Sequence, residues 1–246
     1  MSGTINLRFK DRLGNNLFQY AFARAYAERV GAELRTTAWD VQKVFSLKEG
    51  PIERALPERA DMDFENWDGE TDIEITGWAL HQKCLIYSRK QAKEWMKIDP
   101  ALLRDIPVRK YGIAAHLRRG DFVTMADYVA VSNESYDAAC VDHGLDRRQL
   151  RFVSEESPIE SLNVPANLSY LPDFVALMEA EILLRSNSTF SYWAAVLGNN
   201  RRVFAPDLTG IIPKAGVTQR APFVAGNWPA ISKVHPNCSD LHLRET

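Results

Sequence analysis

Strand-like and helix-like segments alternate through the second half of this chain, and this order constrains its fold more than any other feature. The run GIAAHL (112–117) is apolar as far as Ala115, which is typical of a strand buried on both faces of a parallel sheet. After it the pattern predicts a helix within 132–144, a strand at 150–155, a helix opened by Asp173, a strand at 181–186, a helix opened by Ser188 and ended by Gly198, and a last strand at 201–206. This order predicts a doubly wound α/β sheet, in which ligands bind beyond the carboxyl ends of the strands.

The first half follows the same scheme less clearly. TINLRF (4–9) alternates apolar and polar residues as a half-exposed strand does, and a helix with Gly31 as its stop follows. Residues 36–72 are irregular and acid-rich, and IEITGW (73–78) predicts the second strand, followed by a helix through Trp95 and Met96. Residues 97–110, with two prolines, predict a connector. We therefore expect two domains, 1–106 and 107–246.

Composition excludes several classes of function. The net charge of -2 argues against a nucleic-acid partner, because such proteins usually carry a basic face. No window approaches the roughly 20 apolar residues of a membrane span, and the amino terminus has no apolar signal core, so we expect a soluble protein that is not secreted. Cys84, Cys140 and Cys238 lack pairing or metal-ligand spacing, which suits reduced, buried thiols in the cytoplasm.

The stretch AAHLRRGDF (114–122) places a histidine and two arginines at the end of the buried strand. Side chains alternate across a strand, so His116 and Arg118 should share one face and Arg119 should point to the other. A guanidinium binds two oxygens at once, so Arg118 suits a diphosphate. The alternative is that both arginines pair with Asp121 or other carboxylates and hold the loop.

The starts of two predicted helices offer further ligand groups. Ser188 and Thr189 combine hydroxyls with a helix amino terminus and so suit a phosphate, although Ser188 also suits a simple N-cap. In RLGNN (12–16), Gly14 permits close backbone approach and Asn15 offers an amide to a sugar hydroxyl, or the segment is only a capped helix start.

Carboxylates complete the set of candidate groups. The carboxylate of Asp173 suits the two N–H groups at the edge of a guanine, from which it would accept hydrogen bonds. The alternative is that Asp173 is only the cap of its helix. Glu155 and Glu156, after a strand, are either an acid/base or metal-binding pair or, more commonly, solvated loop residues. No zinc or other metal site is evident in the sequence.

Five segments together carry a resemblance to a known family. The segments DRLGNNLFQYAFARAYAERVGAEL, ITGWALHQ, AAHLRRGDFV, FVSEES and LLRSNSTFSYWAAVLGNNRRVFAP resemble, in order and spacing, those of the α-1,2-fucosyltransferases of glycosyltransferase family 11. The resemblance implies a GT-B-like fold, with two Rossmann-like domains facing across a cleft. The first domain would lie on the acceptor side, and the second would bind the GDP-sugar.

The resemblance also implies roles for individual residues. Arg118 would act on the donor diphosphate and would be catalytic together with Asn15. The residues implied in donor binding are Arg12, Gly14, Asn15, His116, Arg118, Asp173, Ser188, Thr189 and Phe190. Asp11 stands where the family has glycine, and Tyr192 stands where it has tryptophan.

The implied reaction is transfer of L-fucose from GDP-β-L-fucose to a glycan hydroxyl, with inversion and α-1,2 linkage, no metal, and no cofactor beyond the donor. The implied place is the cytoplasm, with a peripheral position at a membrane where glycans are assembled as the alternative. Two other hypotheses for the function stay open: a transferase of the same fold with another donor or linkage, and an inactive nucleotide- or glycan-binding protein. The general base is open between Asp11 and the leaving phosphate. The oligomeric state is also open.

Overall fold

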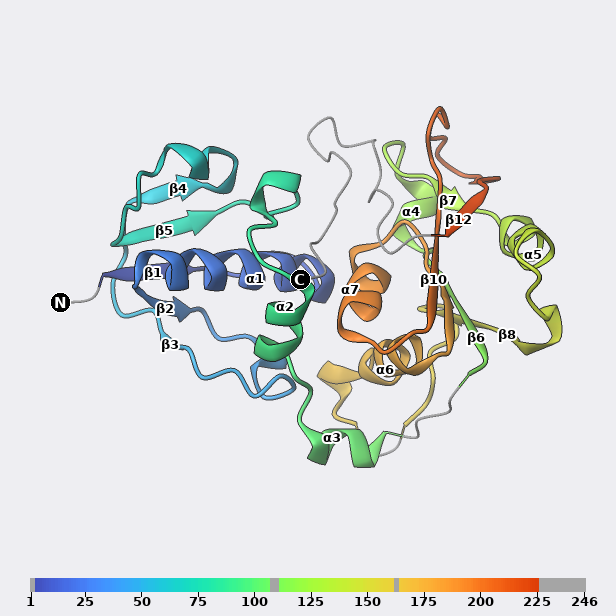
Figure 1. Cartoon of the computed structure of the whole chain (residues 1–246), viewed down its shortest axis with the longest axis horizontal. Helices are drawn as coiled ribbons and strands as arrows, with labels where there is room; N and C mark the ends of the chain where they lie inside the picture. Colours follow the sequence, from blue (N-terminus) through green and yellow to red (C-terminus); the bar gives the residue numbers. More distant parts are fainter. Residues whose placement is uncertain (1–2, 107–110, 162–163, 226–246) are drawn as a thin grey trace. The chain divides into compact units, whose positions relative to one another are not determined.

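A computed structural model describes residues 3–106, 111–161 and 164–225 of the chain. It divides into two compact units, and in the described residues the division falls between Asp99 and Pro100 (Figure 1). The sequence placed the boundary after residue 106, and residues 107–110 lie outside the described part. Each unit is an α/β structure built on its own sheet.

The first unit contains a five-stranded sheet in the order β3-β2-β1-β5-β4, with all neighbouring strands parallel. The strands are β1 Thr4–Leu7, β2 Glu33–Thr36, β3 Gly50–Pro51, β4 Glu58–Ala60 and β5 Ile73–Thr76. IEITGW (73–78) contains a strand as predicted, but it is the fifth and not the second, because β2, β3 and β4 lie between it and β1. Those strands have two to four residues and several charges, too few for a readable alternation.

One long helix, α1 Leu13–Val30, packs on β1 and β2 and contributes more buried hydrophobic residues than any other described element of this unit. It ends at Gly31, whose φ of 67° is the left-handed conformation that glycine adopts without strain, as predicted. Short 3-10 turns at Asp40–Gln42 and Asp61–Asn66 lie between strands, and a third, Gln82–Cys84, lies between β5 and the next helix.

Two short helices close this unit and begin the next. The predicted helix through Trp95 is α2 Arg89–Trp95, which opens with a capping box between Ser88 and Gln91. The connector predicted at 97–110 was wrong in part, because it contains the helix α3 Pro100–Asp105. Proline at the first helical position lacks only an N–H that would be unsatisfied there, so Pro100 starts this helix and does not break it.

The second unit has the sheet order β12-β10-β9-β6-β8. Its strands are β6 Ile113–Leu117, β8 Leu150–Ser154, β9 Ile182–Leu184, β10 Arg202–Pro206 and β12 Phe223–Ala225. The first four are parallel, and β12 is antiparallel to β10. The four parallel strands were predicted, but β10 is not the last strand. A separate parallel pair joins β7 Ala130–Val131 to β11 Thr218–Gln219.

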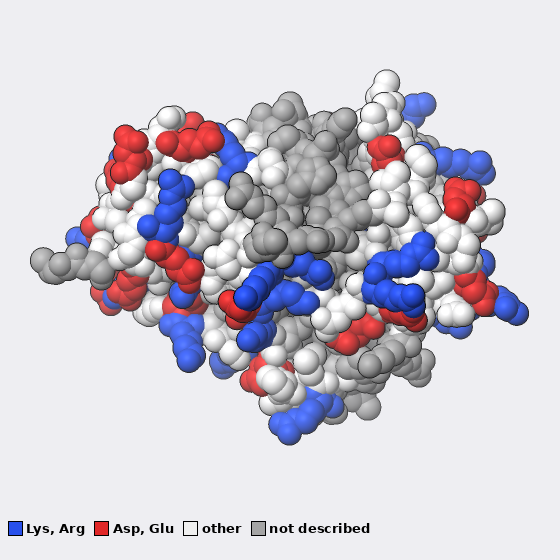
Figure 2. All heavy atoms as spheres, in the orientation of Figure 1, with Lys and Arg blue, Asp and Glu red and all other residues white. Residues whose placement is uncertain are grey.

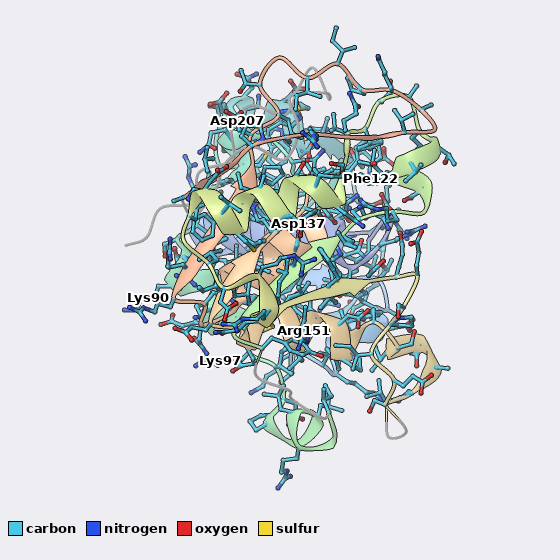
Figure 3. The ribbon with its side chains drawn as sticks, turned by 90° about the vertical axis from the view of Figure 1, so that its right-hand side faces the viewer. Lys90, Lys97, Phe122, Asp137, Arg151 and Asp207 are labelled. Atoms are coloured by element: carbon cyan, nitrogen blue, oxygen red, sulfur yellow. The ribbon has the colours of Figure 1, made fainter. Side chains whose placement is uncertain are left out.

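Helices cover both faces of this sheet, as a doubly wound fold requires. Figure 3 shows α5 Asn133–Asp142 lying across one face, where Tyr136 and Cys140 join the apolar cluster with Ile113 and Phe204. Helix α6 Leu171–Glu179 packs against β6, β8 and α7 Thr189–Leu197. The remaining short elements are α4 Asp121–Thr124 and the 3-10 turns Arg147–Gln149 and Ala166–Leu168.

Two of the expected features of the whole chain can be placed in the structure. Cys84 and Cys140 are free, buried thiols, and Cys238 lies outside the described residues. In the part of the chain that the structure describes, every helix is too short or too polar to cross a membrane.

Candidate functional site

His116 occupies the carboxyl half of β6 and is buried against the loop that follows β9. Its Nδ1 is 2.7 Å from Ser186 Oγ, and its ring centroid is 5.4 Å from that of Phe190 on α7. Burial, and then the charges of Arg118 and Arg119, lowers the pKa of His116 to about 3. The imidazole is therefore neutral at physiological pH, where it offers one N–H donor and one acceptor.

Arg118 follows the end of β6 and lies between two carboxylates. Its Nη1 donates to Glu155 Oε2 at 2.5 Å, and its Nη2 donates to Asp121 Oδ1. The guanidinium carbon is also 4.7 Å from the centroid of the Phe122 ring, which Figure 3 labels at α4. The side chain is 14% exposed. The guanidinium thus engages two oxygens at once, and in this structure both belong to carboxylates, the pairing that the sequence offered as the alternative to a diphosphate.

Arg119 has a different set of partners. Its Nη1 donates to the Val131 carbonyl at 2.7 Å, and its Nη2 donates to Asn133 Oδ1 at 2.6 Å. The predicted alternation assumed that the strand continues through both arginines, but β6 ends at Leu117. Arg118 and Arg119 therefore bind different groups. Arg119 connects the end of β6 to β7 and to the start of α5.

The amino terminus of α7 lies at the same edge of the sheet, directly after β9. Ser188 is its N-cap, as predicted, and Ser188 Oγ accepts a hydrogen bond from Phe190 N at 3.3 Å. Thr189 is the first helical residue and is half-buried. The free N–H groups and the positive end of the helix dipole at this point make it suitable for an anion.

Phe190 is the centre of a ring cluster beside this helix start. Its ring centroid lies 5.1 Å from that of Phe174 on α6 and 6.5 Å from that of Tyr170, in addition to the contact with His116. Phe190 is half-buried and its neighbours hold its orientation. A fixed, partly exposed ring of this kind can pack against the face of a nucleotide base.

Asp173 does not open α6 as predicted. The helix begins two residues earlier, at Leu171, because Pro172 fits the first turn of a helix. Asp173 Oδ1 accepts the backbone N–H of Ile159 at 2.8 Å. Burial raises the pKa of Asp173 to about 6, and the hydrogen bond from Ile159 opposes this shift. Near neutral pH the carboxylate is ionised and retains acceptor capacity.

The predicted first-unit site is the start of α1. Arg12 is the N-cap residue, without a side-chain cap, and Gly14 and Asn15 lie within the first helical turn. Asn15 Nδ2 donates to Asp11 Oδ2 at 2.7 Å, and Asp11 Oδ1 accepts the backbone N–H of Arg12 at 2.8 Å. Asp11 has a φ of 77°, so the left-handed residue of this turn is Asp11 and not Gly14.

Three residues that follow β9 belong to this region but were not predicted from the sequence. Ser186 holds the His116 ring, and Arg185 is buried with its guanidinium carbon 5.3 Å from the centroid of the Tyr192 ring. Burial lowers the pKa of Arg185 to about 10, so it remains charged. Both amide atoms of the buried Asn187 lack a hydrogen-bond partner among the described residues. The signal available in the sequence was the polar run RSNS (185–188) directly after an apolar strand.

No metal centre is formed by the side chains that the structure describes, since no three His, Cys, Asp or Glu residues converge there. The two glutamates considered for such a role separate: Glu155 binds Arg118, whereas Glu156 donates its backbone N–H to Ser154 Oγ.

Comparison with known proteins supports the fold and not the sequence family. No family model and no curated protein sequence matches this chain. Among solved structures, the α-1,6-fucosyltransferase NodZ soaked with GDP-fucose aligns over 92% of this chain and 100% of its own, with 14% identity and a TM-score of 0.53. A structure of the fucosyltransferase NodZ from Bradyrhizobium gives a TM-score of 0.54, also at 14% identity and over 92% of this chain and 99% of its own.

A plant enzyme gives the same result. A variant of Arabidopsis thaliana FUT1 in complex with GDP aligns over 94% of this chain and 76% of its own, with 11% identity and a TM-score of 0.52. At these identities the likeness concerns the fold, and it confirms the predicted α/β, GT-B-like class. Membership of the α-1,2 family stays a prediction.

Proposed function

We propose that this protein transfers L-fucose from GDP-β-L-fucose to a hydroxyl of a glycan acceptor, giving an α-1,2 linkage with inversion. One observation carries the proposal: His116, Arg118 and the α7 amino terminus meet at the carboxyl ends of the adjacent strands β6 and β9. This is the edge where doubly wound sheets bind nucleotides. The solved structures of similar fold support the donor class, because they are fucosyltransferases crystallised or soaked with GDP or GDP-fucose.

The described side chains can be assigned to the parts of the donor. Ser188 and Thr189 would bind phosphate oxygens at the positive end of α7. Phe190 would pack on the guanine, with neutral His116 beside it, and the ionised Asp173 would accept the N–H groups of the guanine edge. In the first unit, Arg12, Gly14 and Asn15 would form the turn that contacts the donor.

Arg118 would supply most of the electrostatic stabilisation of the transition state. In the proposed step the acceptor oxygen forms a bond to fucose C1 while the bond from C1 to the β-phosphate oxygen breaks, and the electron pair leaves with GDP. Negative charge grows on that phosphate in the transition state. A fixed guanidinium that binds two phosphate oxygens stabilises this charge more than it stabilises the ground state. No metal is needed for this step.

The proton of the acceptor hydroxyl has two routes. It can pass to the leaving phosphate as the C1–O bond lengthens, or to a carboxylate such as Asp11. Asp11 is engaged with Asn15 and with the backbone of Arg12. We therefore assign the proton to the phosphate and Asn15 to orienting the sugar.

The direct test is the product of a single turnover with GDP-fucose and a β-galactoside acceptor in excess chelator. We expect an α-fucoside in the first proton NMR spectrum, and undiminished transfer without divalent ions. A β-fucoside, or strict dependence on manganese, would contradict the mechanism.

One observation favours a second candidate, a nucleotide- or glycan-binding protein without turnover. The guanidinium of Arg118 already binds Asp121 and Glu155, which a donor diphosphate must displace. Binding of GDP-fucose without transfer or hydrolysis, over a range of acceptors, would identify this candidate. Transfer from GDP-mannose in preference to GDP-fucose would instead identify a transferase of the same fold with another donor.

A further inference from the structure

Trp78 is an exposed indole at the carboxyl edge of the first-unit sheet. It lies two residues after the end of β5 and is 48% exposed, the only tryptophan of the described residues in the exposed class. Tryptophan is highly buried on average, so an indole that is nearly half exposed at the edge where parallel sheets bind ligands has an apolar face available to a ligand.

The backbone on both sides of Trp78 is held in an unusual conformation. Gly77 and Ala79 have φ values of 113° and 52°, both in the left-handed region. For Ala79 this conformation is strained, because its Cβ comes too close to the following carbonyl oxygen. The buried carboxylate of Asp61 holds the turn, because its Oδ2 accepts the Ala79 N–H. A Cβ at position 77 would overlap this carboxylate, so the turn also requires glycine there.

Two further aromatic residues follow the neighbouring strands. Phe9 and Trp39 come after β1 and β2, and their ring centroids are 4.3 Å apart. Strands β2, β1 and β5 are adjacent and parallel, so all three aromatic residues belong to loops at one edge of this sheet. Phe9 and Trp39 are half-buried against each other, and Trp78 is the residue that is left open to solvent.

The size of the exposed apolar surface limits what it can bind. The other large hydrophobic residues of the exposed class in the described chain all belong to the second unit, namely Met125, Val141, Phe152, Ile212, Val217 and Val224. A single indole offers far less area than the roughly 800 Å² per partner of a stable protein interface. It matches a small ring with one apolar face and a polar rim.

We propose that Trp78 is a platform on which a neutral pyranose ring of the acceptor glycan stacks. The axial C–H groups of a pyranose form such an apolar face, which packs on the indole, while the ring hydroxyls stay in contact with water or with the indole N–H. This inference rests on the proposed function, which supplies the glycan. It goes further by naming the residue in the first unit that binds it.

The experiment separates sugar binding from donor binding. The probes are methyl β-galactopyranoside, N-acetyllactosamine and chitotetraose, each titrated with and without saturating GDP. Sugar affinity is measured by saturation-transfer NMR and by tryptophan fluorescence, and GDP affinity by calorimetry. The variants are Trp78→Ala, Trp78→Phe and, as the matched control, Ile212→Ala, which truncates a side chain that is 76% exposed in the other unit.

We expect at least one probe to bind the wild type and to change its tryptophan fluorescence. Trp78→Ala should weaken that affinity about tenfold, the scale of a lost aromatic contact. Trp78→Phe should keep most of the affinity measured by NMR but lose the fluorescence change, because it retains a ring and removes the reporter. GDP affinity and the melting temperature should stay unchanged in all three variants.

The outcomes keep the two proposals apart. If GDP binds but none of the three sugars does, or if Trp78→Ala binds the sugar as well as Ile212→Ala, the platform is excluded and the donor assignment stands. If GDP does not bind and a sugar still binds through Trp78, the proposed transferase function fails and the platform stands. A persisting fluorescence change in Trp78→Phe also excludes stacking on this indole, even if Trp78→Ala fails to fold.

Discussion

Arg118 makes two ion pairs at the position where the proposed donor diphosphate would bind. Its two carboxylate partners, Asp121 and Glu155, neutralise the guanidinium in this structure. A diphosphate would replace weaker, partly solvated ion pairs by charge-assisted hydrogen bonds of the same geometry. In the proposed site, Asp121 and Glu155 would therefore compete with the donor diphosphate for the Arg118 guanidinium.

The two neighbouring arginines should respond differently to substitution by lysine. In Arg118→Lys the ammonium cannot bind two oxygens in one plane, so we expect kcat to fall at least about 100-fold, the scale seen when one donor to a developing negative charge is removed. In Arg119→Lys we expect a loss of stability and a smaller effect on kcat, because Arg119 binds Val131 and Asn133. Steady-state kinetics and thermal unfolding of both variants check this. A larger kcat loss in Arg119→Lys would reverse the assignment.

Removing the charge of Glu155 should strengthen nucleotide binding. In Glu155→Gln the competing ion pair at 2.5 Å is lost, while a side chain of the same shape remains. A partly exposed pair of this kind is worth up to about 1 kcal/mol, so GDP affinity should rise by up to about fivefold. Calorimetry with GDP measures the effect, with Glu156→Gln as the matched control. Weaker GDP binding in Glu155→Gln would show that Glu155 helps to hold the donor.

The pH dependence of GDP binding tests Asp173. Its pKa of about 6 lies above its ordinary value of 3.8 because the side chain is buried. Guanine N–H groups need the ionised form, so GDP affinity should rise with pH and level off above about pH 7, being about tenfold lower one unit below the pKa. Asp173→Asn should abolish this dependence. A wild-type affinity that stays constant through pH 6 would remove Asp173 from the guanine site.

The raised pKa of Asp173 affects folding stability in the opposite direction: stability falls with rising pH, whereas GDP affinity should rise. The folded state binds the proton of Asp173 more tightly than the unfolded state, so this group's contribution is fully present below about pH 4 and is lost as the pH rises through about 6. Without nucleotide, Asp173→Asn should therefore melt higher than the wild type at pH 7 and show a smaller gain at pH 4. The asparagine can still accept the Ile159 N–H, so no hydrogen bond is lost.

At the scale of elements, the start of α1 depends on a residue in a left-handed conformation. Asp11 takes this conformation and uses its carboxylate to hold Arg12 and Asn15. Asparagine tolerates the left-handed region as well as aspartate does, so Asp11→Asn should fold normally. We expect it to retain most of the activity, because the leaving phosphate takes the proton. A loss of about 100-fold in kcat at unchanged stability would make Asp11 the general base.

The elements that the sequence predicted are those whose ends carry their own signals. The strand β6 begins with three apolar residues, Ile113 to Ala115, and α7 has Ser188 as its N-cap and Gly198 as its C-cap. The missed strands β3 and β4 have two and three residues and depend on tertiary pairing with β2 and β5. Their short, charged segments have no local pattern from which to predict them.

The residues of the candidate site also differ in whether the sequence could predict them. Residues on a strand end or helix start, such as His116 and Ser188, were predictable because the fold class fixes where those ends lie. Of the partners of Arg118, Asp121 was named from the sequence because it lies three positions away, whereas Glu155 was not, since it lies 37 positions away. The polar run at 185–188 is a sequence signal that includes Asn187, but the lack of a hydrogen-bond partner for its amide among the described residues depends on packing.

At the scale of the whole molecule, the charge distribution favours a small ligand over a polyanion. Figure 2 shows acidic and basic side chains interspersed on the visible face of each unit, in keeping with a net charge of -2. In the proposed site the positive charge for the donor would be local, supplied by Arg118 and the α7 amino terminus. Donor affinity should therefore depend far less on salt than the binding of a nucleic acid does.

Calorimetric titration of the wild-type protein with GDP-fucose, GDP, ADP and UDP, all in excess chelator, tests the central claim most directly. The proposed site predicts that GDP and GDP-fucose bind at least about tenfold more tightly than ADP or UDP, because Asp173 and His116 recognise guanine and no metal bridges the phosphates. Equal affinity for the three nucleoside diphosphates, or binding that appears only when manganese is added, would contradict it.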